Sequence, residues 1–204
     1  MKKWLKSAAL AAMLTMTTTT AFAWAPGQMV IPEDIYTWIQ STDRMNYYIN
    51  KKKIAYDFGQ SGDMYFGAIL VPVIKSYDGV QVKDIVEKRK WRDQSVEGFE
   101  FLSGEADYIR INFENNTVLL NRVDYLTYSM TTLESKTPNQ LIELAKLPAK
   151  SVERRFYESI ILYEQQHYEE IIKNTKEKLT EEEFNKLKKA RNRFHKKLEK
   201  RAKG

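Results

Sequence analysis

The stretch that decides the fold is ADYIRINFENNTVLLNRVDYLTY, residues 106–128. From Ile109 to Phe113 apolar residues alternate with polar ones, which is the period of a strand with one buried face. Asparagine tolerates positive φ, so Asn115-Asn116 predicts a tight turn in the middle of the stretch. Residues 106–128 therefore predict an antiparallel β-hairpin.

The segments before the hairpin also favour strands. Aromatic and β-branched residues predict strands over 35–40 and 45–58. The most apolar run is MYFGAILVPVIKSY, residues 64–77, in which Pro72 indicates an edge strand or a bulge. An Asp-Gly turn signal then precedes VQVKDIV, residues 80–86, whose alternating valines predict one more strand. This half of the chain therefore predicts a mostly antiparallel sheet.

The pattern becomes helical after the hairpin. Thr137-Pro138 predicts a short helix that runs to about Lys146, because proline suits the first turn of a helix. Ser151 is placed to cap a long helix that continues to about residue 178, with apolar residues at three- and four-residue steps. We therefore predict an α+β fold, in which a mostly antiparallel β-sheet is followed by C-terminal helices and ends in a basic amphipathic helix.

The last helix has a defined start. Thr180 and Glu183 have the spacing of a capping box, and Leu179 and Phe184 have the spacing of a hydrophobic staple. The preceding helix should therefore break near Leu179, and a separate helix should run to about Lys203.

The first residues, MKKWLKSAALAAMLTMTTTTAFA (1–23), have the three parts of a secretory signal peptide. The apolar part is too short to span a bilayer, and no later run predicts a transmembrane span after signal cleavage. We expect a signal peptide over 1–23, an α+β domain over 24–178 and a basic C-terminal helix over 179–204. The protein should be exported, to the periplasm, the cell surface or the medium. It has no cysteine, so it forms no disulfide.

The formal charge of +6 is unevenly distributed. Residues 173–204 contain 13 Lys/Arg and five Glu, a net +8, whereas residues 24–172 carry a net −5. A basic helix on an acidic body predicts partners that are anionic, such as an envelope polymer or a lipid surface. Export argues against nucleic acid as a physiological partner.

The predicted last helix has two faces. The polyanion-binding candidates are its cations Lys188, Lys189, Arg193, Lys196, Lys197, Lys200 and Arg201. Its docking or partner face consists of Phe184, Leu187, Phe194 and Leu198, with Arg191 in the same stripe. Three interpretations stay open: the stripe packs on the rest of the protein, the helix lies on an anionic surface, or the stripe pairs with a partner helix.

No residue pattern predicts catalysis, and we predict no enzyme, no catalytic residue, no cofactor and no metal. The sequence lacks phosphate-binding, dinucleotide-binding, zinc-protease and serine-hydrolase motifs. Glu164-x-x-His167, with Glu170 one turn on, has the spacing of half a di-iron site but has no second copy. Five aromatic residues could line a carbohydrate or peptide groove, or could belong to the core: Trp38, Tyr47, Tyr48, Tyr56 and Trp91.

Trp38, Ser41 and NYYIN (46–50) form a loose W…S…YYI pattern after the predicted signal. Through this pattern, residues 35–135 resemble small exported domains of the surface-adhesin-E type. Other members of that type usually carry cysteines, whereas this chain has none. The resemblance implies a surface or envelope binding domain. The leading hypothesis is a non-enzymatic exported binding module. The alternatives are a periplasmic chaperone or inhibitor that uses a helical hairpin, and a carboxylate hydrolase without a recognisable motif.

Overall fold

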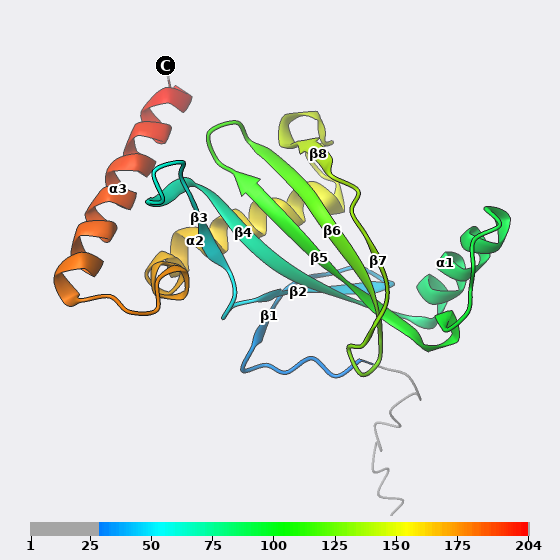
Figure 1. Cartoon of the computed structure of the whole chain (residues 1–204). Coiled ribbons are helices and arrows are strands. Elements are labelled where there is room, and N and C mark those ends of the chain that lie inside the picture. The colour runs from blue at the N-terminus through cyan, green and yellow to red at the C-terminus, as the bar shows by residue number, and fades with distance from the viewer. Residues whose placement is uncertain (1–28, 204) are drawn as a thin grey trace, which may run out of the picture.

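The computed structural model describes residues 29–203 and has the predicted α+β fold (Figure 1). The predicted signal peptide, 1–23, lies outside the described residues. The sheet has eight strands, all paired antiparallel. These are β1 (Tyr36–Ser41), β2 (Met45–Asn50), β3 (Ala55–Phe58), β4 (Met64–Tyr77), β5 (Leu102–Asn112), β6 (Thr117–Thr127), β7 (Thr132–Lys136) and β8 (Gln140–Glu143).

The strand order is β1-β2-β4-β5-β6-β7, with β3 added beside β4 and β8 beside β6. The predicted hairpin is confirmed as β5 and β6, and Asn116 has φ 50° in the loop that joins them. Pro72 belongs to a strand paired on both sides. It lies where the neighbour of β4 changes from β2, which ends its pairing at Val73, to β3, which starts at Leu70. A residue without an N–H is tolerated at such a change of partner.

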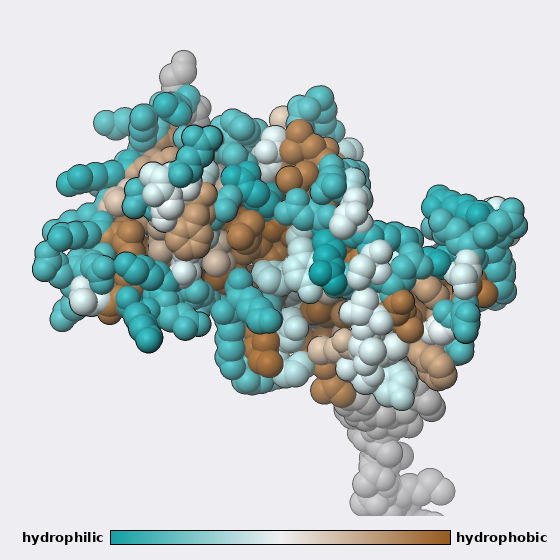
Figure 2. Space-filling model, in the orientation of Figure 1, coloured by the Kyte–Doolittle hydropathy of each residue, from teal (hydrophilic) through white to brown (hydrophobic). Residues whose placement is uncertain are grey.

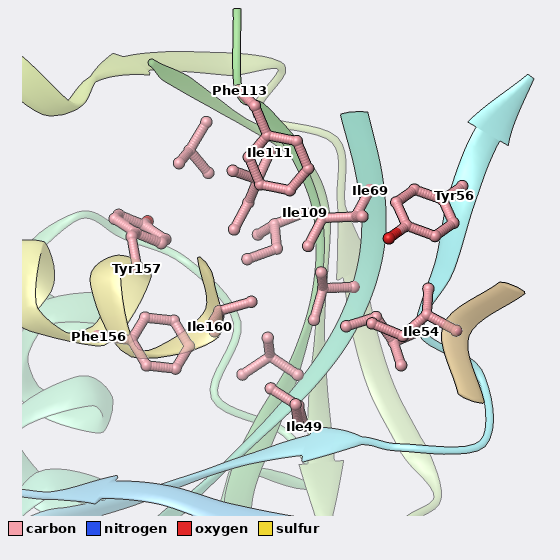
Figure 3. Packing of buried hydrophobic residues seen from close by; sticks show 14 of the residues in the cluster. Ile49, Ile54, Tyr56, Ile69, Ile109, Ile111, Phe113, Phe156, Tyr157 and Ile160 are labelled. Carbon is pink, nitrogen blue, oxygen red and sulfur yellow. The ribbon is translucent and has the colours of Figure 1, made fainter. Parts of the chain in front are cut away.

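One face of the sheet is covered by α2 (Val152–Thr175), and the main core lies between them (Figure 3). Ile49 from β2, Ile69 from β4 and Ile109 from β5 meet Phe156 and Ile160 of α2. The opposite face is covered in part by the segment before β1, where Met29 packs in a smaller cluster. Both faces of the central strands are therefore apolar over part of their length.

Residues 79–91 form a helix, α1, so the strand predicted at 80–86 is wrong. Asp78 is its N-cap, and its side chain accepts a hydrogen bond from the N–H of Gln81 at 2.7 Å. The capping bond decides the local structure, because two alternating valines are a weak strand signal beside a satisfied helix N-terminus. α1 projects from the end of the sheet opposite to α3 (Glu181–Lys203) (Figure 1).

The helix predicted from Thr137 to Lys146 is also wrong. Asn139 has φ 46°, and residues 140–143 form β8, which pairs with Thr117–Leu120 of β6. Only 144–146 make a helical turn, of 3₁₀ type. A proline suited to a first helical turn did not decide the local structure, because residues 140–143 pair with β6, which lies 20 to 26 residues earlier in the chain.

Both long helices begin at the predicted caps. Ser151 Oγ accepts from the N–H of Arg154 at 3.2 Å, at the start of α2. Thr180 Oγ1 accepts from the N–H of Glu183 at 3.2 Å, and Glu183 Oε2 accepts from the N–H of Thr180 at 3.0 Å. These two reciprocal bonds confirm the capping box of α3.

Gly104 lies where β5 approaches β4 too closely for a side chain. A Cβ at this position would lie 2.3 Å from the carbonyl oxygen of Lys75. We expect Gly104→Ala to lower the free energy of unfolding by about 1–3 kcal/mol, measured by urea denaturation, because backbone must shift. Gly67→Ala is the control with the smaller expected cost, since the three atoms nearest to its Cβ belong to the side chain of Tyr65 and not to the backbone. Equal costs for the two substitutions would contradict this explanation.

Candidate anion-binding surface on the C-terminal helix

The capping box of α3 strongly favours the ionised form of its glutamate, Glu183. The backbone hydrogen bond from Thr180, followed by the contact with Lys176 at 3.0 Å, lowers the pKa of Glu183 to about 2. Glu183 is therefore ionised at any physiological pH and complements the positive end of the helix dipole. The capping box therefore holds the first turn of α3 in place, a few residues after α2 ends at Thr175.

The apolar stripe of α3 packs on the body of the protein. Phe184, Leu187, Phe194 and Leu198 all contact the main hydrophobic core. Phe194 meets Tyr65 of β4 edge to face, with ring centroids 6.3 Å apart. α3 accordingly stands beside the β3–β4 hairpin and the end of α2 (Figure 1). Of the three interpretations left open by the sequence, the structure has the first, in which the stripe packs on the rest of the protein.

A buried ion pair joins α3 to α2. Glu164 of α2 is 0% exposed and Arg191 of α3 is 7% exposed. The Nη2 atom of Arg191 lies 2.9 Å from both carboxylate oxygens of Glu164, and Nε lies 3.2 Å from Oε1. Tyr56 of β3 donates its hydroxyl hydrogen to Oε1 of the same carboxylate. We call Tyr56, Glu164, Arg191 and His195 the Glu164 cluster.

Burial sets the protonation of the other two members of this cluster. Burial, and then the charge of Glu164, raises the pKa of Tyr56, so its hydroxyl keeps the proton that it donates. Burial also lowers the pKa of His195, although its Nε2 lies 3.6 Å from Glu164. His195 is therefore neutral at pH 7, and the cluster contains one anion and one cation. The two opposite charges compensate each other in the low-dielectric interior.

The exposed side of α3 bears cations that no acidic side chain neutralises. Among residues 29–201, no carboxylate lies within ion-pair distance of six of the seven predicted polyanion-binding residues, and all six are exposed. We call these six the cationic face: Lys189, Arg193, Lys196, Lys197, Lys200 and Arg201. The seventh, Lys188, is half-buried and pairs with Glu169 at 2.5 Å. Figure 2 shows hydrophilic side chains along the outer side of α3.

The cationic face and the docked stripe point in different directions. At about 100° per residue, the six cations fall within an arc of about 140°, and the four apolar side chains fall within an arc of about 80°. The centres of the two arcs are about 130° apart. The helix can therefore present its cations to an external surface while its apolar side chains remain packed.

The other residues considered from the sequence do not come together as a site. Glu164 turns toward α3, whereas His167 stacks on Tyr163, with ring centroids 4.2 Å apart. Within the described residues, no group of three or more acidic or histidine side chains could hold a metal ion. Tyr47 and Tyr56 are buried, whereas Trp38 and Trp91 are exposed, so the five aromatics do not line one groove.

Sequence reasoning missed the partner of Arg191. The sequence did contain a signal for such a partner. Arg191 lies inside an apolar stripe, and a charged side chain that becomes buried there needs a buried side chain of opposite charge. Glu164 could not be chosen from many acids by spacing alone.

None of the described helices combines the length and the apolarity needed to cross a membrane. No protein-family model, curated protein or solved structure matches this chain.

Proposed function

We propose that this protein is a non-enzymatic, exported binding module whose cationic face holds a phosphate-bearing surface of the cell envelope. The single observation that carries the proposal is the set of six exposed cations, free of ion pairs, on the side of a docked helix that faces away from the body. The signal-like N-terminus and the charge difference between residues 24–172 and 173–204 support it. The resemblance of residues 35–135 to surface-adhesin-E-type domains agrees with it.

The docked position of α3 determines the mode of binding. An amphipathic helix that inserts into lipid needs its apolar face free. In this protein that face contacts the main core, and Arg191 is held by Glu164. Binding through the cationic face is therefore electrostatic and peripheral, and α3 keeps its place on the body.

The charge distribution also orients the protein on such a surface. Residues 24–172 carry a net −5 and are repelled by phosphates, whereas the cationic face is attracted. Each Lys or Arg near an anionic surface contributes about 1 kcal/mol. The acidic body should therefore face away from the surface.

The chaperone alternative used the apolar surface of a helical hairpin to hold clients. We do not propose it, because the four stripe side chains contact the protein's own core. Nor do we propose that the stripe binds a partner helix, for the same reason.

The test uses the chain without residues 1–23, which keeps every described residue. We expect it to co-sediment with vesicles that contain phosphatidylglycerol and not with neutral phosphatidylcholine vesicles. Raising NaCl from 0.05 to 0.5 M should weaken binding at least about tenfold, because salt screens exposed charges. Soluble polyphosphate is a third arm: strong competition would indicate a phosphate-bearing polymer, and weak competition a lipid surface. Equal binding to neutral and anionic vesicles would contradict the proposal.

A further inference from the structure

A cavity of about 540 Å³ lies between the sheet and the first turns of α2, away from the cationic face. The sheet contributes Tyr47 from β2, Lys75 from β4 and Asp107 from β5. The helix contributes Phe156 and Tyr157. Its volume is in the range of sites that enclose a small organic molecule.

Lys75 is the centre of a buried group of charges on the sheet. Its Nζ lies 2.6 Å from Oδ2 of Asp107 and 2.7 Å from Oε1 of Glu105. Burial alone would lower the pKa of Lys75, but the two carboxylates outweigh burial and raise it. The ammonium group is therefore permanent. With both carboxyls ionised, the three side chains carry a net charge of −1.

The second oxygen of Asp107 accepts no hydrogen bond from the described residues. Asp107 is 5% exposed, and its Oδ1 atom is buried without a partner although the side chain lines the cavity. A buried carboxylate oxygen without a donor is costly. Oδ1 is closed off from the cavity as well as from bulk water, so an N–H or O–H group of a molecule in the cavity reaches it, and removes this cost, only after the Asp107 carboxylate rotates.

The charges on the cavity wall favour a cation over an anion. The two lining cations are already paired, Arg44 with Asp84 at 2.6 Å and Lys75 with its two carboxylates. Asp43 and Glu153 add two further carboxylates to the wall. An anionic ligand would find no unpaired lysine or arginine among the lining residues, and a cation would find several acceptors.

Three aromatic rings, those of Tyr47, Phe156 and Tyr157, form part of the remaining wall, together with aliphatic and uncharged polar side chains. The rings of Tyr47 and Phe156 are 5.0 Å apart, and those of Phe156 and Tyr157 are 5.4 Å apart. Aromatic faces attract ammonium groups, most strongly where water is excluded. We propose that this cavity binds a small organic amine in its protonated form, which donates an N–H to Oδ1 of Asp107 and packs against these three rings.

We do not propose a carboxylate hydrolase at this site. Asp107 and Glu105 share one lysine, Lys75, and of these two carboxylates only that of Asp107 lines the cavity. Glu153, on the helix side, is at hydrogen-bond distance of 3.5 Å from the hydroxyl of Tyr157. The proposal does not depend on the cationic face, so either can fail without the other.

The pH dependence of amine binding follows from the groups around Asp107. Burial raises the pKa of Asp107 to about 6, with Lys75 opposing and Glu105 adding to the shift. Five other titratable groups face the charged group formed by Lys75, Glu105 and Asp107. They are Tyr77 on β4, Tyr47 on β2, Tyr125 on β6, and Tyr157 and Glu153 on α2. Burial raises the pKa of each of these tyrosines, so between pH 5 and 8 they stay neutral.

The experiment compares benzylamine with benzyl alcohol, which has nearly the same shape and no charge. Binding to the chain without residues 1–23 is followed by NMR through the ring signals of Tyr47, Phe156 and Tyr157. We expect benzylamine to bind at least about tenfold more tightly at pH 7.5. Its affinity should fall about tenfold by pH 5, because Asp107 becomes protonated while a primary amine stays charged.

Two variants locate the amine. Asp107→Asn should weaken benzylamine at least tenfold, whereas Asp43→Asn, which removes an equal charge from the exposed rim, should leave the affinity within about threefold. If Asp107→Asn does not fold, the pH profile of the unaltered chain decides the matter. Equal affinity for amine and alcohol, or an amine affinity that does not change between pH 7.5 and 5, would overturn the proposal.

Discussion

Replacing Glu164 with alanine is expected to lower the free energy of unfolding by about 3–5 kcal/mol. Glu164 is 0% exposed, and its carboxylate is the ion-pair partner of Arg191 and accepts the hydroxyl hydrogen of Tyr56. Without it, the guanidinium of Arg191 stays buried with no counter-charge. The measurement is urea denaturation of the chain without residues 1–23, monitored by circular dichroism.

Two controls separate the buried charge from other causes. Arg193→Ala, on the same helix but exposed and without an ion pair, should change stability by no more than about 0.5 kcal/mol. The double variant Glu164→Met with Arg191→Met should recover at least half of the loss, because it removes both charges and retains volume. A loss below about 1 kcal/mol for Glu164→Ala would mean that the pair does not hold α3 in place.

Neutralising half of the cationic face should weaken binding to anionic vesicles about 100-fold. The variant is Lys189→Gln, Arg193→Gln and Lys196→Gln in one chain. Each cation contributes about 1 kcal/mol near an anionic surface, and about 3 kcal/mol corresponds to roughly a 100-fold change in affinity. Co-sedimentation with phosphatidylglycerol vesicles at 0.05 M NaCl measures it. Stability should change little, because all three side chains are exposed and none forms an ion pair with the described residues.

A matched variant removes the same charge from the other end of the protein. Lys83, Lys88 and Arg92 belong to α1 or follow it directly, are exposed, and pair with no acidic residue in the part of the chain that the structure describes. Changing all three to Gln should weaken binding less than about threefold. If the two triple variants lose affinity equally, net charge and not the cationic face controls binding. Deleting α3 would not test this, because the core would lose four side chains.

The elements predicted correctly are those governed by neighbours in sequence. The hairpin loop at Asn116, the cap of α2 at Ser151 and the capping box at Thr180 all depend on residues within four positions. Local signals gave the wrong element at two places. After Asp78 a strand pattern competed with a helix cap, and the segment that forms β8 pairs with a distant strand, β6. Distant pairing cannot be derived from periodicity, because many partners fit one strand equally well.

The candidate site divides in the same way. The two faces of α3 follow from helical spacing, so the apolar stripe and the exposed cations could be listed from the sequence. The contact between Glu164 and Arg191 spans 27 residues, and spacing does not select it. The cavity beside Asp107 depends on how β2, β4, β5 and α2 meet, and no linear motif encodes that meeting.

Amide hydrogen exchange on the vesicle-bound protein tests most directly whether α3 binds from its docked position. Exchange is measured with and without phosphatidylglycerol vesicles, at a lipid concentration where sedimentation shows all of the protein bound. We predict that protection in α3 and in the facing half of α2 is unchanged or increased on binding, because the apolar stripe and the Glu164–Arg191 pair stay in place. Loss of protection around Glu164, with gain confined to α3, would show that the helix leaves the body to insert into lipid, and would contradict it.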